Sequence, residues 1–156
     1  MSQITILSLY LLAAVAFTTS RLPRFESRAR PLYIVALLLG ATGAVMHGQA
    51  IFGLILPRYG FDLTMGNAVA LIGFELAVIG LIAALEPTLR GISGGLILLA
   101  ALTVMLMGPS GDTVDSASQS WQLRAHVLIA LLSYGLLTDG AIVALYALVQ
   151  ERRLQA

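Results

Sequence analysis

The chain has 156 residues, of which 58% are hydrophobic and 11% are charged. Soluble domains usually carry about 25% charged residues, so this composition, with a mean hydropathy of +0.91, predicts a membrane protein. A formal net charge of +1 favours neither a nucleic acid nor a strongly acidic partner, and the lack of cysteine excludes disulfides, thiolate metal sites and iron–sulfur clusters held by this chain.

Five apolar segments follow one another along the chain. They cover residues 4–20, 32–56, 64–85, 92–107 and 125–149. A helix needs about 20 apolar residues to cross a bilayer, and only the first and fourth segments are close to the short limit of that length. Long runs without period-two alternation favour helices over barrel strands. We therefore expect one all-α integral membrane domain over residues 1–156, built as a bundle of five transmembrane helices.

The arginines predict how these helices are oriented. If successive loops lie on alternate sides of the membrane, one side holds only Arg58 and Arg124. The other side holds seven arginines, namely Arg21, Arg24, Arg28, Arg30, Arg90, Arg152 and Arg153. The positive-inside rule places the larger set in the cytoplasm, so the N-terminus is expected outside and the C-terminus inside.

Four ionisable side chains lie within or at the ends of the apolar segments: His47, Glu75, His126 and Asp139. A charge near the bilayer centre costs at least about 2.5–3.5 kcal/mol, so such residues usually face the protein interior. The helical rise places His47 about 4.5 Å from the middle of its segment and His126 about 18 Å from the middle of its own. This depth difference of about 13 Å excludes a single metal shared by both histidines, since metal–nitrogen bonds are near 2 Å.

The stretch GAVMHGQAIFG surrounds His47 with small residues and leaves two interpretations of the imidazole. The residues that share its helical face are Gly40, Gly43, Ala44, Ala50 and Ile51. In the first interpretation this face packs against a neighbouring helix and His47 makes a hydrogen bond across it. In the second, His47 is a metal or haem ligand, since imidazole is a common axial ligand of haem iron. The residues alone favour the packing role.

Glu75 and Asp139 both fall near the middle of their segments. Adjoining helices would allow the two carboxyls to share a proton. Two interpretations stay open, a proton path and a neutral hydrogen-bonding role in helix packing, and the residues alone slightly favour the packing role. Ser133 and Tyr134 are further polar residues in the last segment. No histidine lies one helical turn from Ser133, so a hydrolase triad has no support and no enzymatic activity is expected.

Two stretches resemble the cytochrome c assembly transmembrane family. In RAHVLIALLSYGLLTDGAIVALYALVQERRL, residues 124–154, a histidine at the outer end is followed by a Ser-Tyr pair, a small-residue stretch and Leu-Tyr-Ala-Leu before basic residues. LLGATGAVMHGQAIF, residues 38–52, resembles that family's earlier helix with a buried histidine. In segment order and loop lengths the chain is most similar to the YpjD-like inner-membrane branch, within the CcsA-, CcmC- and HemX-like haem-handling proteins.

This resemblance implies a haem-handling component of the bacterial inner (cytoplasmic) membrane, similar to proteins of cytochrome c maturation, which holds or passes haem without catalysing a reaction. By position, His47 resembles the first ligand of the family's membrane histidine pair, and His126 the first of its outer pair. The second ligand of each pair lies in a later half that this sequence does not match. We therefore expect a fragment, or a chain that needs a membrane-protein partner or a second copy of itself.

Two alternatives stay open. The first is a non-haem scaffold or regulatory subunit of a membrane complex. The second is a proton- or ion-conducting subunit that uses Glu75 and Asp139. Neither alternative involves nucleic acid, and the lipid bilayer is the expected surroundings in every case.

Overall fold

The computed structural model describes residues 3–55, 64–87, 89–107 and 120–155. In chain order the elements are α1 (Gln3–Thr19), the 3-10 helix η1 (Pro23–Arg28), α2 (Ala29–Ile55), α3 (Met65–Leu85), α4 (Arg90–Val104) and α5 (Trp121–Leu154). The described ranges contain five α-helices and no strand, so the all-α prediction is confirmed for this part of the chain. Each predicted apolar segment corresponds to one α-helix, but α4 ends at Val104, three residues before the predicted end of its segment, and residue 56 of the second segment lies outside the described residues. The α5 helix extends beyond its apolar run at both ends.

Local sequence explains where several of these helices begin and end. The hydroxyl of Thr64 caps the start of α3 by accepting from the backbone N–H of Asn67 at 3.4 Å. Ser120 caps α5 in the same way through the N–H of Leu123, also at 3.4 Å. The α3 helix ends at Leu85, and the next residue, Glu86, is extended because Pro87 follows it and disfavours helical backbone at the preceding residue.

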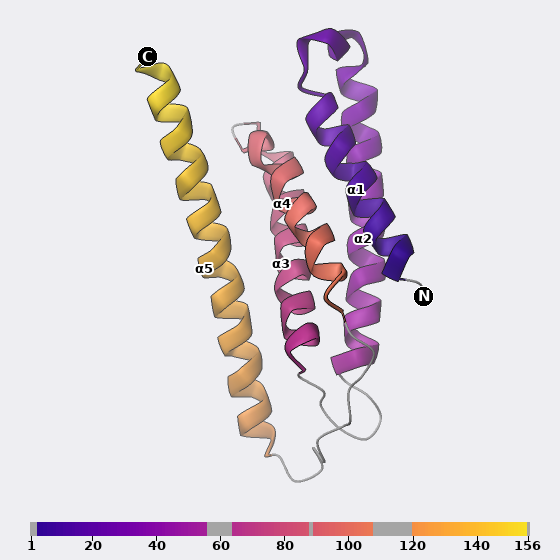
Figure 1. The fold of residues 1–156 in the computed structure, drawn as a ribbon, viewed down its shortest axis with the longest axis vertical. Coiled ribbons are helices and arrows are strands. Elements are labelled where there is room, and N and C mark those ends of the chain that lie inside the picture. The colour runs from indigo at the N-terminus through magenta and orange to yellow at the C-terminus, as the bar shows by residue number, and fades with distance from the viewer. Residues whose placement is uncertain (1–2, 56–63, 88, 108–119, 156) are drawn as a thin grey trace.

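The first four α-helices form one packed group, in which α1 contacts α2 and α4, and α3 contacts α2 and α4 (Figure 1). Small residues let these helices approach closely, as is usual in membrane-type packing. The buried alanines are Ala13, Ala14, Ala16, Ala36, Ala44, Ala70, Ala77, Ala83, Ala84, Ala100 and Ala101. Larger side chains, led by Tyr10, Leu96 and Ile97, fill the space that remains.

The α5 helix stands along one side of this group and contacts it mainly through α3 (Figure 1). Among its described side chains, only Gly135 and Asp139 are buried. Leu128, Ile142 and Tyr146 are half-buried on the same side of the helix. The remaining faces of α5 are exposed and largely apolar, so this helix is attached along a single narrow stripe.

Three helices are long and apolar enough to cross a membrane, and they correspond to α2, α3 and α5. The other two apolar helices are shorter, with 17 residues in α1 and 15 in α4. At 1.5 Å per residue these shorter helices span about 26 and 23 Å, against about 30 Å for the hydrocarbon core. The prediction of apolar, membrane-type helices is therefore confirmed for three helices by length and composition.

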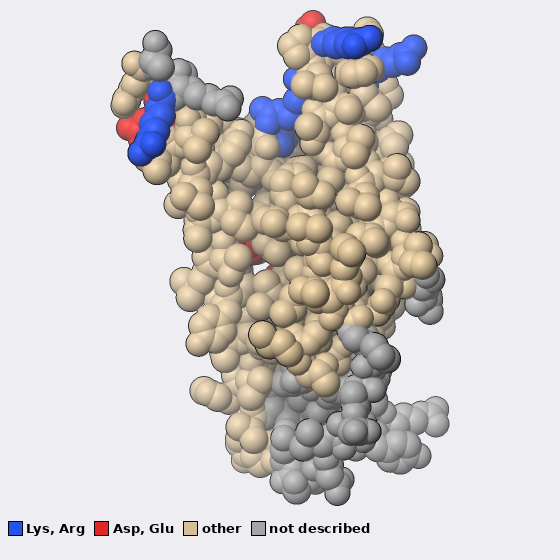
Figure 2. All heavy atoms as spheres, in the orientation of Figure 1, with Lys and Arg blue, Asp and Glu red and all other residues tan. Residues whose placement is uncertain are grey.

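Basic side chains gather at one end of the molecule, where α1, α3 and α5 end and where α2 and α4 begin (Figure 2). The described arginine side chains at this end are Arg21, Arg24, Arg28, Arg30, Arg90 and Arg152. Arg58 and the side chains of Arg124 and Arg153 lie outside the described residues. We call this part of the molecule the arginine-rich end.

Candidate functional site

His47 lies on α2 and is fully buried between two neighbouring helices. Its Nδ1 lies 3.2 Å from the hydroxyl of Tyr10 on α1, within hydrogen-bonding distance. Its ring also makes edge contacts, with ring centroids 5.7 Å from that of Tyr10 and 6.0 Å from that of Phe74 on α3. His47 therefore joins α1, α2 and α3, which is the packing arrangement that the residues alone favoured.

The small-residue face around His47 is already occupied by neighbouring side chains. A Cβ placed on Gly43 would come within 2.9 Å of the Tyr10 ring, and one on Gly48 within 3.1 Å of the Phe74 ring. The Nε2 atom of His47 is buried and has no hydrogen-bond partner within the described ranges. That nitrogen has ligand chemistry, but the His47 side chain is 0% exposed and its ring contacts the rings of Tyr10 and Phe74. The residues around His47 do not fit a haem in this packing.

His126 lies on the second turn of α5 and is exposed. His126 does not contact His47, whose neighbours lie on α1 and α3. Ser133 and Tyr134 are also exposed on α5, and the Ser133 hydroxyl donates to the carbonyl of Ile129 at 2.7 Å. Within the part of the chain that the structure describes, no group of three or more His, Cys, Asp or Glu residues is arranged to hold a metal ion.

Glu75 and Asp139 are brought together across the contact between α3 and α5. Both side chains are buried, with exposed fractions of 9% for Glu75 and 4% for Asp139. They are close enough for their charges to interact. The Oε2 atom of Glu75 occupies the position that a Cβ on Gly135 would take, so the carboxyl rests directly on the α5 backbone one turn before Asp139. We call these two residues the acidic pair.

All four carboxyl oxygens of the acidic pair are buried and have no hydrogen-bond partner among the described residues. Burying an unpaired ion costs several kcal/mol even after the protein relaxes. Two neighbouring carboxyls avoid much of that cost when they hold a proton between them, because a protonated carboxyl donates and an ionised one accepts. The space-filling view shows acidic atoms within a gap at mid-height in the molecule (Figure 2), away from the acidic residues near the helix ends.

Sequence reasoning missed three residues that shape these two sites. Tyr10 and Phe74 enclose His47, and neither carries a local signal that identifies its partner. The carboxyl of Glu75 lies against Gly135. Gly135 comes four residues before Asp139, so these two residues lie on one face of α5. That small-residue spacing was a usable signal for the contact with another helix.

Comparisons with protein-family models, with curated proteins and with solved structures found no match to this chain. The resemblance to the cytochrome c assembly family therefore stays a prediction, as do a haem cofactor and a partner membrane protein. The functional argument consequently rests on the geometry of His47 and of the acidic pair. Among the described residues, the acidic pair brings together four buried and unpartnered oxygens, whereas His47 leaves one nitrogen unpartnered.

Proposed function

We propose that this chain is a multi-pass protein of the bacterial inner membrane with five spanning helices. Support comes from the three long apolar helices and from the packing of the shorter α1 and α4 among them. The arginine-rich end faces the cytoplasm in this proposal, by the positive-inside rule. The N-terminus is then outside and the C-terminus inside.

Within that membrane domain, the proposed function is proton transfer through the acidic pair, as a proton-conducting or proton-coupled subunit. The observation that carries this proposal is the group of four buried, unpartnered carboxyl oxygens at the contact of α3 and α5. Ionisable groups inside a membrane domain commonly mark proton relays. Glu75 lies midway along α3 and Asp139 lies close to the middle of α5.

A proton fits the acidic pair better than a metal cation does. Calcium takes six to eight oxygen ligands, and magnesium requires a nearly ideal octahedron. The acidic pair offers two carboxyls between apolar helices, with no third His, Cys, Asp or Glu beside them in the described ranges. A proton needs only one donor and one acceptor, which the pair supplies by itself.

The loose attachment of α5 supports the same function. Proton conduction through a buried pair requires that the pair reach water on both sides of the membrane, at once or in turn. Because Gly135 and Asp139 are the only buried residues on the described part of α5, a small movement of this helix changes the access to both carboxyls without disturbing the packed group of α1 to α4.

Proton flux in liposomes tests this function directly. The purified chain is reconstituted with a pH-sensitive dye inside, and a potassium gradient with valinomycin drives proton entry. The wild-type chain is expected to conduct, and Glu75→Gln and Asp139→Asn are each expected to lower the flux to that of empty liposomes. Glu151→Gln is the matched control, because it removes an exposed carboxylate from the same helix. Wild-type flux equal to that of empty liposomes, or full flux in Glu75→Gln, would refute the proposal.

A further inference from the structure

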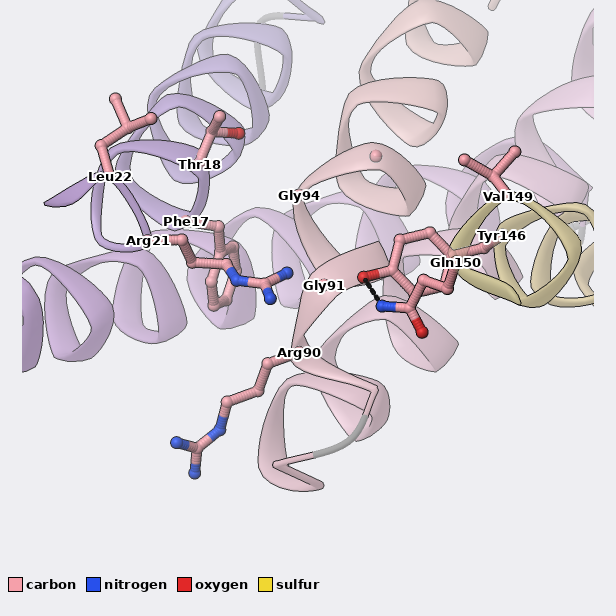
Figure 3. Close-up of a pocket in the computed structure, with 11 residues that line it drawn as sticks. Phe17, Thr18, Arg21, Leu22, Arg90, Gly91, Gly94, Tyr146, Val149 and Gln150 are labelled. Atoms are coloured by element: carbon pink, nitrogen blue, oxygen red, sulfur yellow. Dashed lines mark hydrogen bonds between the residues drawn. The ribbon is translucent and has the colours of Figure 1, made fainter. Parts of the chain in front are cut away.

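A cavity lies at the arginine-rich end, between the end of α1, the start of α4 and the last turns of α5 (Figure 3). Its volume is about 810 Å³. Polar groups on its wall include Arg21, Tyr146 and Gln150, while Phe17 and Val149 supply apolar surface. This cavity lies about two helical turns from the acidic pair along α5, and the proton-transfer proposal does not use it.

Arg21 and Tyr146 converge on one point of the cavity wall. A Cβ on Gly91 would meet both the Arg21 guanidinium and the Tyr146 hydroxyl, so both groups lie over the α4 backbone at that glycine. Figure 3 shows the guanidinium of Arg21 pointing toward Gly91 and Tyr146. No hydrogen bond or ion pair within the described ranges engages this guanidinium, which leaves its N–H donors available to a ligand.

The Tyr146 hydroxyl is also available as a donor. Gln150, one turn later on α5, donates its side-chain N–H to the Tyr146 oxygen at 2.9 Å. That bond uses the tyrosine as an acceptor, and its own hydroxyl proton stays free to be donated into the cavity. The wall therefore presents a cation and a neutral hydroxyl donor side by side.

A second arginine, Arg90, also lines the cavity, with its guanidinium turned away from Tyr146 (Figure 3). Arg90 donates from Nε to the carbonyl of Ala84 at 3.0 Å, and its guanidinium lies 4.7 Å from the centre of the Tyr33 ring. A smaller adjoining cavity of about 340 Å³ is lined by Arg30 and shares Arg21 and Arg90 with the first. No acidic side chain among the described residues lines either cavity.

We propose that this cavity binds a phosphate group, carried either by an anionic lipid headgroup or by a free phosphate compound. Arginine guanidinium groups match phosphate oxygens in geometry and charge, and the neighbouring hydroxyl adds one more donor. The apolar wall of Phe17 and Val149 suits the carbon portion of such a ligand. The position at the arginine-rich end matches the level at which charged headgroups meet a membrane protein.

The test measures binding to the purified full-length chain with two probes. Native mass spectrometry compares phosphatidylglycerol with phosphatidylcholine, and calorimetry titrates inorganic phosphate. Arg21→Gln is expected to weaken binding about tenfold, as for the loss of one charge-assisted hydrogen bond. Gly95→Phe is expected to block binding by filling the cavity, because Gly95 lines the cavity and a Cβ placed there meets nothing within 4 Å. Arg24→Gln is the matched control, since it removes the same charge at the same end but does not line the cavity.

A lipid headgroup is supported if the chain binds phosphatidylglycerol more tightly than phosphatidylcholine. In that case Arg21→Gln and Gly95→Phe weaken the binding and Arg24→Gln does not. The same pattern of losses with inorganic phosphate, without a preference between the lipids, supports a free phosphate compound. Equal losses in Arg21→Gln and Arg24→Gln would show a diffuse charge effect and overturn the site. Unchanged binding of both probes in Arg21→Gln would also overturn it, whatever the folding of Gly95→Phe.

Discussion

Replacing Gly135 by alanine tests whether the Glu75 carboxyl really rests on α5. Alanine favours a helix over glycine by about 1 kcal/mol, so an open glycine on α5 should gain stability on this change. Gly140 is such a position, because a Cβ there meets nothing within 4 Å. At Gly135, however, the new methyl takes the place of the Glu75 carboxyl, which must then leave its position against α5.

The size of the difference follows from the packing. Forcing an extra methyl into an occupied site typically costs about 1–3 kcal/mol. Because the displaced atoms are the end of a flexible side chain, the cost lies at the lower end of this range. Gly135→Ala should therefore be less stable than Gly140→Ala by about 1 kcal/mol, a gap of about 2–4 °C in melting temperature for a chain of this size. Thermal unfolding in detergent, followed by circular dichroism, measures this gap directly.

A double substitution separates the carboxyl from any other cause. In a Glu75→Ala background the carboxyl is absent, and Gly135→Ala should then behave like Gly140→Ala. Equal stability of Gly135→Ala and Gly140→Ala in the unmodified chain would show that Glu75 does not lie against Gly135. That result would remove the geometric basis of the acidic pair.

Two further predictions concern His47. Tyr10→Phe removes the hydroxyl beside Nδ1 and should destabilise the chain by about 0.5–1.5 kcal/mol in the same unfolding assay, whereas Tyr134→Phe, which alters an exposed side chain, should have almost no effect. The packing around the imidazole also predicts that added haemin gives no Soret band that depends on His47. A Soret band in the wild-type chain that is lost in His47→Ala, and kept in His126→Ala, would instead support the haem prediction.

The helices were predictable because length and hydropathy identify membrane-type segments, and proline and polar residues mark their ends. The burial of His47 was predictable for a similar reason, since an imidazole in an apolar run is costly unless the protein encloses it. Its partner was not, because Tyr10 lies on another helix and periodicity describes only the faces of a single helix. For the same reason the sequence did not predict whether Glu75 and Asp139 are in contact, since this depends on whether α3 and α5 are neighbours.

The α5 helix connects the two proposed sites, because Asp139 and Tyr146 are seven residues apart and lie on one face of it. Apolar surface gives little driving force for helix association inside a membrane, where lipid is as apolar as leucine, so packing and polar contacts decide how a helix is placed. Among the described residues of α5, the polar groups at this contact include the carboxyl over Gly135 and the tyrosine over Gly91, beside the apolar Leu128 and Ile142. A proton gained by the acidic pair, or an anion bound beside Tyr146, therefore acts directly on the few contacts that hold this helix to the other four.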